Sequence, residues 1–562
     1  MLVESGADSL SYEEFVRILR NPIADATLLL AAGLAVVLIF TGFALVFILA
    51  DEHQSQGSAR LRPTLQRLRR TLRKLVHPQS LLLVIYLLIV LPLGQVGLIA
   101  SLTSRVAVPP FVTDELAKSP VAGLLYALAM LVLLYLNLRL LFVLPLISTT
   151  DAGVLAAIAT SWRLSRRRTL RLFGLTVLVG LPHTAALVVV GLLACLPTAV
   201  ADEVAPDRSL IMAATGLAVW QVALFVITAL ATTTLAQSLI VLQRDGLPRL
   251  SGTARPDPAE PGPTMIGTDG GSRSAWPLRA IAGGVALVVI IAGSVINAAA
   301  FQTFDVDRTA EVIAHRGWVD DTVENTVPAL RAAKRAGADR VEFDVQETKD
   351  GKFVVIHDSN LSRLAGLGRE VKDLTQAELT KITVRDGEAS ARIPSLEEWI
   401  ETSRELDLPQ LLEVKLHGGE SPELVPRLLA VLDSYGVADW YTYHSLSRDA
   451  VTQLKEARPS LRVGYIIPIN LSGIPNLDCD FVVIEQASYD DRFLQQARES
   501  GRRIIVWTVQ SEERMQALMI DGVDGIITDH PDTAIAVEHE VAQDEGLTTR
   551  LIERLVRTFP GG

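Results

Sequence analysis

The feature that most constrains this chain is a series of long apolar runs in its first 300 residues. Six segments are each long and apolar enough to cross a bilayer core, which takes about 20 residues of helix. They are residues 26–50, 80–102, 121–147, 173–200, 209–241 and 278–300. We therefore predict that residues 1–302 form a polytopic α-helical membrane domain with about six spans. A flexible linker rich in Pro, Gly, Ser and Thr is predicted at 243–277.

The basic residues between the apolar runs predict which way the helices cross the membrane. Loop 51–79 contains seven Lys and Arg residues, "WRLSRRRTLR" at 162–171 contains five arginines, and the linker holds more. The alternate loops, 103–120 and 201–208, contain at least as many acids as bases. Because basic loops remain cytoplasmic, we predict a multi-pass plasma-membrane protein whose residues 304–562 are extracytoplasmic. The fifth run is 33 residues long. A hidden break that made it two spans would place residues 304–562 in the cytoplasm instead.

The two halves of the chain carry opposite net charge. Residues 1–300 contain 23 Lys and Arg against 17 Asp and Glu, a net charge of +6, whereas residues 301–562 contain 29 against 46, a net charge of −17. A nucleic-acid partner requires a basic face, so we expect no nucleic acid on the acidic half. The bilayer is the expected partner of the first half, and nothing in the sequence indicates an oligomeric state.

The second half alternates short β-branched runs with amphipathic helical stretches. The runs are "EVIAH", "RVEFDV", "FVVIH", "QLLEVK", "WYTYH", "RVGYII", "FVVIE", "RIIVWTV" and "GIITD". Strands separated by helices indicate a parallel sheet, and residues 304–562 have the length of a (β/α)8 TIM barrel. "TKDGKF" is a hairpin signal, so "FVVIH" is predicted to return beside the second strand and leave eight parallel strands. An open doubly wound sheet is the alternative fold, although no Gly-rich dinucleotide-binding motif is present.

Polar residues stand at the ends of several predicted strands, where the side chains that act on substrate gather in such a barrel. They are His315, Arg316, Glu342, Asp344, His357, Glu413, Lys415 and Trp507. Three carboxylates directed into one barrel mouth would repel one another without a cation. Glu342, Asp344 and Glu413 offer hard oxygen ligands, so we predict one divalent ion, Ca²⁺ or Mg²⁺.

Two histidines beside a divalent cation, with an arginine and a lysine nearby, are typical of a site that cleaves a phosphate ester. Arg316 and Lys415 can neutralise the nonbridging phosphate oxygens. An unperturbed imidazole has a pKa of about 6.5, so His315 and His357 can exchange protons with the attacking hydroxyl and the leaving group. The spacing does not decide which histidine is the base.

These residues carry a family resemblance. The order "AHRG…ENT…GADRVEFDVQETKDGKFVVIHDSNLSR…IPSLEEWI…LLEVK…VWTV…GVDGIITDHP" resembles the glycerophosphodiester phosphodiesterase family throughout residues 311–532. The first half resembles the membrane domain fused to some bacterial members. The resemblance implies a phospholipase-C-like barrel that cleaves glycerophosphodiesters to sn-glycerol 3-phosphate and an alcohol with a divalent metal. It assigns catalysis to His315 and His357, the metal to Glu342, Asp344 and Glu413, and phosphate to Arg316 and Lys415. We add Trp507 as a substrate contact.

Four departures from the family pattern are present, of which the first two are Val323, where the family has Pro, and "RLAGLG" at 363–368, which lacks the usual threonine. Gln510 replaces the Asn that tends to follow Trp-Thr-Val, and "YHSLS" from Tyr443 replaces the common Ser-Phe. For His444 within that stretch, a packing role is favoured over pocket lining. The substrate could be a deacylated phospholipid, a lysophospholipid or a glycerophosphate polymer. The rival function is a non-catalytic glycerophosphate-binding receptor that signals through the helices, but every expected histidine and ligand is present.

Overall fold

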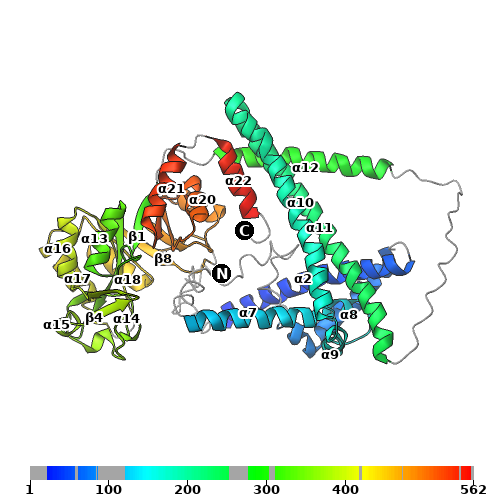
Figure 1. Cartoon of the computed structure of the whole chain (residues 1–562), viewed down its shortest axis with the longest axis horizontal. Coiled ribbons are helices and arrows are strands. Elements are labelled where there is room, and N and C mark those ends of the chain that lie inside the picture. Colours follow the sequence, from blue (N-terminus) through cyan, green and yellow to red (C-terminus); the bar gives the residue numbers. More distant parts are fainter. Residues whose placement is uncertain are drawn as a thin grey trace. The chain divides into compact units, whose positions relative to one another are not determined.

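The computed structural model describes residues 22–56, 61–83, 85, 120–251, 276–302, 310–416, 420–470, 473–543 and 546–558. The chain divides into two compact units. One contains Phe304–Glu545, and the other contains Ala26–Thr303 together with Gly546–Gly562. Figure 1 shows both, coloured along the sequence.

The first unit in chain order is helical. Its elements are α2 (Pro22–Gln56), α3 (Leu61–Arg73), η2 (Lys74–Val76), η3 (Pro78–Ser80), α7 (Pro120–Leu140), α8 (Val143–Thr149), α9 (Val154–Ser165), α10 (Thr169–Val204), α11 (Pro206–Ser251), α12 (Trp276–Gln302) and α22 (Leu547–Thr558). Within the described residues, four helices are long and apolar enough to cross a membrane: Val36–Ser55, Val121–Thr149, Thr169–Val204 and Pro206–Pro248. A shorter apolar stretch, Gly283–Ala299, lies in α12.

Four of the six predicted spans therefore correspond to candidate membrane helices. The sixth corresponds to α12, and the predicted span at 80–102 lies almost entirely outside the described residues. The fifth run raised the question of a hidden break. It forms one continuous helix, α11, of 46 residues, so this run does not divide into two spans.

Helices α10 and α12 both pack on α11, and α12 runs in the opposite direction to α11. A Cβ atom at Gly293 of α12 would lie 3.2 Å from the Ala218 Cβ of α11. Four residues later, the Asn297 side chain donates to the backbone oxygen of Ala214 at 3.3 Å. Later residues of α12 thus contact earlier residues of α11. The end of α12 therefore lies beside the start of α11.

The other end of α11 meets the basic segments of this unit. Asp51, near the end of α2, accepts a hydrogen bond from Arg67 of α3 at 2.6 Å and one from Nε of Arg244 at 3.1 Å. The basic residues of α3 and the C-terminal part of α11 therefore lie at one end of the helices, and the start of α11 lies at the other.

The last helix of the chain, α22, packs on α10 and α11 (Figure 1). The Asp202 carboxylate accepts hydrogen bonds from the backbone N–H groups of Leu547 and Thr548, at 3.2 and 2.9 Å. Leu551 and Leu555 are buried in one cluster with Trp220 and with Phe301 of α12. The segment between α12 and α22 therefore leaves and re-enters the helical unit at the same end. We predicted residues 304–562 as one domain, and nothing in the sequence indicated this packing.

Replacing Leu551 with alanine is expected to loosen α22. Leu551 is fully buried, and a buried Leu→Ala change costs about 2–5 kcal/mol of packing. A helix of 12 residues is marginal without tertiary contacts, so its amide hydrogens should exchange faster in the variant. Hydrogen exchange of residues 547–558, followed by mass spectrometry, measures this. Ile552→Ala, at a side chain that is 47% exposed on the same helix, is the control, and equal exchange in the two variants would show that α22 is not held by this contact.

The second unit is a closed barrel of eight parallel strands. The strands are β1 (Glu311–His315), β2 (Arg340–Glu347), β6 (Gln410–Val414), β7 (Thr442–Ser445), β8 (Val463–Ile467), β9 (Phe481–Glu485), β10 (Arg503–Trp507) and β11 (Gly525–Thr528). Neighbours pair in the order β1-β11-β10-β9-β8-β7-β6-β2, and β2 pairs with β1 to close the barrel. The predicted TIM barrel is confirmed.

Helical segments lie between the strands along the chain, and one follows the last strand. They are α13 (Val327–Ala336), α14 (Ser362–Ala365), η6 (Val371–Asp373), α15 (Gln376–Leu379), α16 (Leu396–Glu405), α17 (Leu424–Ser434), α18 (Arg448–Ala457), α19 (Asp491–Glu499), α20 (Glu512–Asp521) and α21 (Pro531–Gln543). The predicted return strand is β3 (Phe353–Val355), which pairs antiparallel with β2. A hairpin of β4 (Thr383–Asp386) and β5 (Ala389–Arg392) was not predicted. It belongs to an apolar cluster that includes Val354 and Ile356.

Successive side chains along each strand point to opposite faces of the sheet. They form one apolar core between the strands and the helices and a second one inside the barrel. Residues such as Val312, Phe343 and Tyr443 pack toward the helices. The inner cluster consists of Ile313, Leu411, Ile466, Phe481, Val483, Ile505 and Ile527. At Gly464 a Cβ atom would lie 2.2 Å from the Phe481 ring, so only glycine leaves room for that ring inside the barrel. Two residues beyond Ile313, Leu411 and Val483, toward the C-terminal strand ends, stand the polar residues His315, Glu413 and Glu485, on the same side of their strands.

Candidate active site

The register of the strands brings the predicted polar residues to one mouth of the barrel. His315 on β1 is opposite Glu342 on β2. Asp344 on β2 is opposite Glu413 on β6, and Glu413 is opposite His444 on β7. Because strand partners in a parallel sheet lie about 4.8 Å apart, these side chains form one continuous polar layer above the apolar interior.

The turn after β1 is built by its His-Arg-Gly sequence. Arg316 has φ of 55° and Gly317 has φ of 92°, both in the left-handed region. At Gly317 a Cβ atom would lie 2.6 Å from the Ala329 side chain, so this position requires glycine. The turn directs the backbone N–H of Arg316 to Oε2 of Glu342 at 3.1 Å. The motif thus holds both the cationic side chain and a predicted metal ligand in place.

Each predicted catalytic histidine is held through its Nδ1 atom by an aspartate. His315 Nδ1 lies 2.7 Å from Oδ1 of Asp529, and His357 Nδ1 lies 2.8 Å from Oδ1 of Asp358. The side chains of the two histidines remain 15% and 29% exposed. With Nδ1 engaged, Nε2 of each imidazole is the atom left to exchange protons with a substrate.

The contact of Asp529 with His315 was not predicted from the sequence. The signal that could have found it is the position of Asp529 directly after the last strand, where the C-terminal ends of the barrel strands meet. Gln510, noted as a departure from the family pattern, donates to Oδ2 of Asp529 at 2.5 Å. Gln510 therefore helps to fix the position of Asp529, which in turn orients His315.

The surroundings lower the pKa values of His357 and Asp529. Burial, assisted by the positive charges of Arg316 and Lys415, lowers the pKa of His357, so its imidazole is neutral near pH 7. Burial alone would raise the pKa of Asp529, but the charge and hydrogen bond of His315 hold it below its ordinary range. Asp529 therefore remains a carboxylate beside His315.

Replacing Asp529 with asparagine is expected to lower turnover about tenfold, because outer partners of a functional histidine contribute on this scale. The amide keeps the shape of the side chain but removes the charge that orients the Nδ1–H tautomer of His315. A change in kcat without a change in KM is the expected signature, measured by steady-state kinetics on a glycerophosphodiester. Asp532→Asn, at an exposed position on α21, is the matched control. Equal kcat in both variants would show that the His315–Asp529 contact does not serve catalysis.

Asp344 is surrounded by positive and hydrogen-bonding groups. Its carboxylate lies 3.2 Å from Nζ of Lys415 and 3.4 Å from Nε of Arg316, and it accepts a hydrogen bond from Asn325 at 2.7 Å. Burial would raise the pKa of Asp344, but Lys415 and the other charges hold it well below its ordinary value. Arg316 and Lys415 therefore supply part of the counter-charge that we assigned to a metal ion alone.

Arg316 also belongs to a second ion-pair network, which is centred on Glu324. Glu324 accepts hydrogen bonds from Arg316 at 3.0 Å and from both terminal nitrogens of Arg363, at 2.7 and 2.9 Å. Although burial opposes ionisation, Arg316 and Arg363 lower the pKa of Glu324 to about 2. Arg363 also donates to Asp358, the partner of His357, at 2.7 Å. Glu324 and Arg363 thus link the loop after β1 to the His357 loop.

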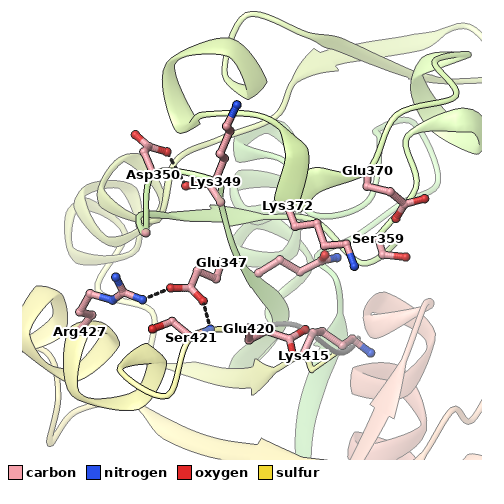
Figure 2. A pocket seen from close by; sticks show the side chains of 13 residues that line it. Glu347, Lys349, Asp350, Ser359, Glu370, Lys372, Lys415, Glu420, Ser421 and Arg427 are labelled. Carbon is pink, nitrogen blue, oxygen red and sulfur yellow. Dashed lines mark hydrogen bonds and ion pairs between the residues drawn. The ribbon is translucent and has the colours of Figure 1, made fainter.

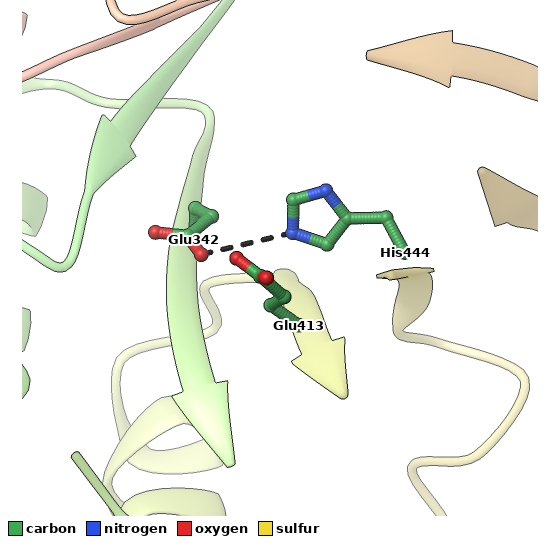
Figure 3. A group of neighbouring side chains, drawn as sticks. All are labelled: Glu342, Glu413 and His444. Atoms are coloured by element: carbon green, nitrogen blue, oxygen red, sulfur yellow. Dashed lines mark ion pairs between the residues drawn. The ribbon is translucent and has the colours of Figure 1, made fainter. Parts of the chain in front are cut away.

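A buried group of three side chains has the composition of a metal site. One ligand atom from each of Glu342, Glu413 and His444 lies within 4.8 Å of the others (Figure 3). All three side chains are buried, with exposed fractions of 2%, 7% and 2%. Two of the three predicted ligands, Glu342 and Glu413, belong to this group, and the assignment of Asp344 as a ligand stays a prediction. The residues present fit a divalent cation.

The remaining predicted residues border the same mouth. Trp507 packs on the inner cluster, and its indole N–H donates to the backbone oxygen of Val483 at 3.2 Å. Lys415 Nζ lies 2.9 Å from Oε1 of Glu413 and also lines a pocket of about 500 Å³ (Figure 2). The other lining residues are Gln346, Glu347, Thr348, Lys349, Asp350, Gly351, Ser359, Glu370, Lys372, Glu420, Ser421 and Arg427.

Comparisons with known proteins cover both halves of the chain. Residues 1–246 match the family described as the membrane domain of glycerophosphoryl diester phosphodiesterase, and residues 315–533 match the glycerophosphoryl diester phosphodiesterase family. A glycerophosphodiester phosphodiesterase of Caldanaerobacter subterraneus is 31% identical over 237 residues, which are 40% of this chain and 96% of that protein. One of Bacillus altitudinis is 28% identical over 255 residues, 41% of this chain and 99% of that protein.

Two solved structures are also similar. A phosphodiesterase of Oleispira antarctica, in complex with the product sn-glycerol-3-phosphate, is 25% identical and matches 42% of this chain and 98% of its own, with a TM-score of 0.38. A glycerophosphodiester phosphodiesterase of Thermotoga maritima is 28% identical and matches 40% and 97%, with a TM-score of 0.34.

The relative from Caldanaerobacter is matched over nearly its whole length at 31% identity, which confirms the family predicted from the strand-end motifs. The match of residues 1–246 adds the membrane domain. The chain belongs to the glycerophosphodiester phosphodiesterase family of phosphodiester hydrolases, in the form that carries a fused membrane domain.

Proposed function

We propose that this chain is a membrane-anchored, metal-dependent enzyme that hydrolyses glycerophosphodiesters to sn-glycerol 3-phosphate and an alcohol on the extracytoplasmic side. The observation that carries the proposal is the pair of histidines, each bound to an aspartate through Nδ1, beside a buried group of carboxylates. The names of the relatives agree with this activity. A receptor that only binds its ligand has no need of two oriented proton carriers.

We assign separate roles to the two histidines from the lowered pKa of His357. His357, neutral near pH 7, accepts the proton of the glycerol 2-hydroxyl while that oxygen forms a bond to phosphorus. The bond from phosphorus to the alcohol oxygen breaks, and His315 donates a proton to the departing alcohol. Water then opens the cyclic glycerol phosphate with the roles reversed: His315 accepts a proton from water, and His357 returns one to the 2-oxygen.

The other site residues bind and orient the phosphate. Glu342 and Glu413 would hold a divalent ion, which when bound supplies positive charge to the nonbridging oxygens. Arg316 and Lys415 are the cationic side chains of the same mouth, and burial among carboxylates fixes their positions. The pocket beside Lys415 has room for the leaving alcohol, and its charged lining of both signs suits a polar head group better than an acyl chain (Figure 2).

Three contacts within the helical unit support an extracytoplasmic barrel. The basic end of the helices, marked by the contacts of Asp51, is the end expected in the cytoplasm. The end of α12 and the helix α22 lie at the opposite end, near the start of α11. The segment that contains the barrel would therefore depart from and return to the extracytoplasmic side.

The activity is tested with the purified full chain in detergent, supplied with Mg²⁺, Ca²⁺ or Mn²⁺. Glycerophosphocholine, lysophosphatidylcholine and polyglycerophosphate are offered in parallel, and glycerol 3-phosphate is measured with a coupled dehydrogenase. We expect glycerol 3-phosphate from glycerophosphocholine, together with choline. If the chain bound all three compounds but released no glycerol 3-phosphate, the result would instead support the non-catalytic receptor function.

The side of the membrane is tested by cysteine labelling, because both native cysteines, Cys195 and Cys479, are buried. Glu388→Cys lies on the exposed turn between β4 and β5, and Arg166→Cys lies on an exposed basic segment. A membrane-impermeant maleimide should label Glu388→Cys in intact cells and Arg166→Cys only after permeabilisation. The reverse pattern would place the barrel in the cytoplasm.

A further inference from the structure

His444, at the end of β7, is a buried histidine without a hydrogen-bond partner in the described part of the chain. Only 2% of the residue is exposed, and neither Nδ1 nor Nε2 forms a hydrogen bond within those residues. An imidazole in such a place leaves its polar nitrogens unsatisfied, which costs free energy unless another group binds there. A packing role, which the sequence favoured, does not account for this cost.

The ring of His444 is directed toward the carboxylates of Glu342 and Glu413 (Figure 3). Its Nε2 lies 3.7 Å from Oε1 of Glu342, which is too long for a hydrogen bond. Oε2 of Glu342 is already engaged by the backbone N–H of Arg316, so Oε1 is the oxygen that faces the ring. Glu413 reaches the same place from β6, the strand between the other two.

The spacing of these atoms suits one shared cation. Ligands bonded at about 2.0–2.2 Å to one ion lie at most about 4.4 Å from each other. The three ligand atoms lie within 4.8 Å of one another, so movements of a few tenths of an ångström would complete the coordination. The donor set would then be two carboxylate oxygens and one imidazole nitrogen.

We propose that His444 is a direct ligand of the divalent ion, together with Glu342 and Glu413, and that it gives the site a preference for Mn²⁺, Co²⁺ or Zn²⁺ over Ca²⁺ and Mg²⁺. The inference rests on the proposed metal dependence and specifies it. Ca²⁺ and Mg²⁺ take oxygen ligands almost entirely, whereas an imidazole nitrogen favours borderline transition metals. The ion therefore differs from the Ca²⁺ or Mg²⁺ that the carboxylates alone predicted.

The test measures metal binding to the full chain in detergent after removal of bound metal with a chelator. Pulsed electron paramagnetic resonance of the Mn²⁺-loaded protein reports nitrogen bound to the ion as a ¹⁴N coupling. Titration calorimetry gives the affinities for Mn²⁺ and Ca²⁺. The wild-type chain should show the ¹⁴N coupling and bind Mn²⁺ more tightly than Ca²⁺.

His444→Gln offers an oxygen in place of the nitrogen and preserves most of the side-chain volume. It should lose the ¹⁴N coupling and weaken Mn²⁺ binding by at least about tenfold, while Ca²⁺ binding changes by less than about threefold. His539→Gln, at an exposed position on α21, should resemble the wild type.

Three results would overturn the proposal: a ¹⁴N coupling that survives in His444→Gln, a wild-type chain that binds Ca²⁺ as tightly as Mn²⁺, or a wild-type chain that does not bind Mn²⁺. None of these readouts requires turnover, so hydrolysis of glycerophosphocholine by the same preparations shows separately whether the proposed function holds.

Discussion

Replacement of either His315 or His357 with glutamine is expected to lower turnover of glycerophosphocholine by at least about a hundredfold, the scale of general acid or base catalysis. Each imidazole is oriented by an aspartate at 2.7 or 2.8 Å and keeps part of its surface exposed at the barrel mouth. Glutamine can retain a hydrogen bond to the aspartate but cannot exchange a proton near pH 7. The loss should fall on kcat, with little change in KM, because neither residue is assigned to phosphate binding.

The two variants should also differ in a way that tests their separate roles. A substrate whose leaving group is an acidic phenol needs no proton as it departs. With such a glycerophosphodiester, His315→Gln should recover most of its activity in the first step, whereas His357→Gln should not. His539→Gln on α21 controls for the loss of an exposed histidine. Near-normal turnover of glycerophosphocholine by either site variant would remove the two-histidine mechanism.

Replacement of Glu413 with glutamine is expected to weaken divalent-ion binding by at least about tenfold and to lower turnover about a hundredfold at a fixed metal concentration. Glu413 is buried, lies beside Glu342 and His444, and forms an ion pair with Lys415 at 2.9 Å. Removal of its charge leaves Lys415 with Asp344 as its remaining carboxylate partner in the site. Titration calorimetry and steady-state kinetics measure the two effects.

Excess metal distinguishes a ligand from a proton carrier. Turnover by Glu413→Gln should recover in part as the metal concentration is raised above the new dissociation constant, whereas the histidine variants should not respond. Glu388→Gln, on the exposed β4–β5 turn, is the matched control. Wild-type metal affinity in Glu413→Gln would exclude Glu413 from the metal site.

Much of the barrel could be predicted because its signals are local. Alternating β-branched runs, the "TKDGKF" turn and strand-end polar residues gave the eight parallel strands, the return strand β3 and the positions of the two histidines. The helical half was also predictable in outline, since span length is set by the bilayer. The continuity of α11 was not, because a run of apolar residues alone does not show whether a helix is broken.

Apart from Asp358 beside His357, the partners of the site residues could not be predicted, because they depend on pairings between distant segments. Asp529 is 214 residues from His315 in sequence, and only closure of β11 against β1 brings them together. His444 meets Glu342 through two successive strand pairings. The docking of α22 on α10 and α11 depends on apolar side chains that resemble those of any surface helix. Local patterns thus indicated the residues of the candidate site, and tertiary pairing determined their contacts.

The central claim is that a divalent ion at Glu342 and Glu413 makes the barrel mouth an active phosphodiesterase site. The most direct measurement is a metal titration of the chelator-treated full chain, with bound metal and the rate of glycerol 3-phosphate release recorded on the same samples. We predict that the rate is negligible without metal and rises in proportion to occupancy until one ion is bound per chain. Full activity in samples with less than about a tenth of an equivalent of bound metal would contradict the account.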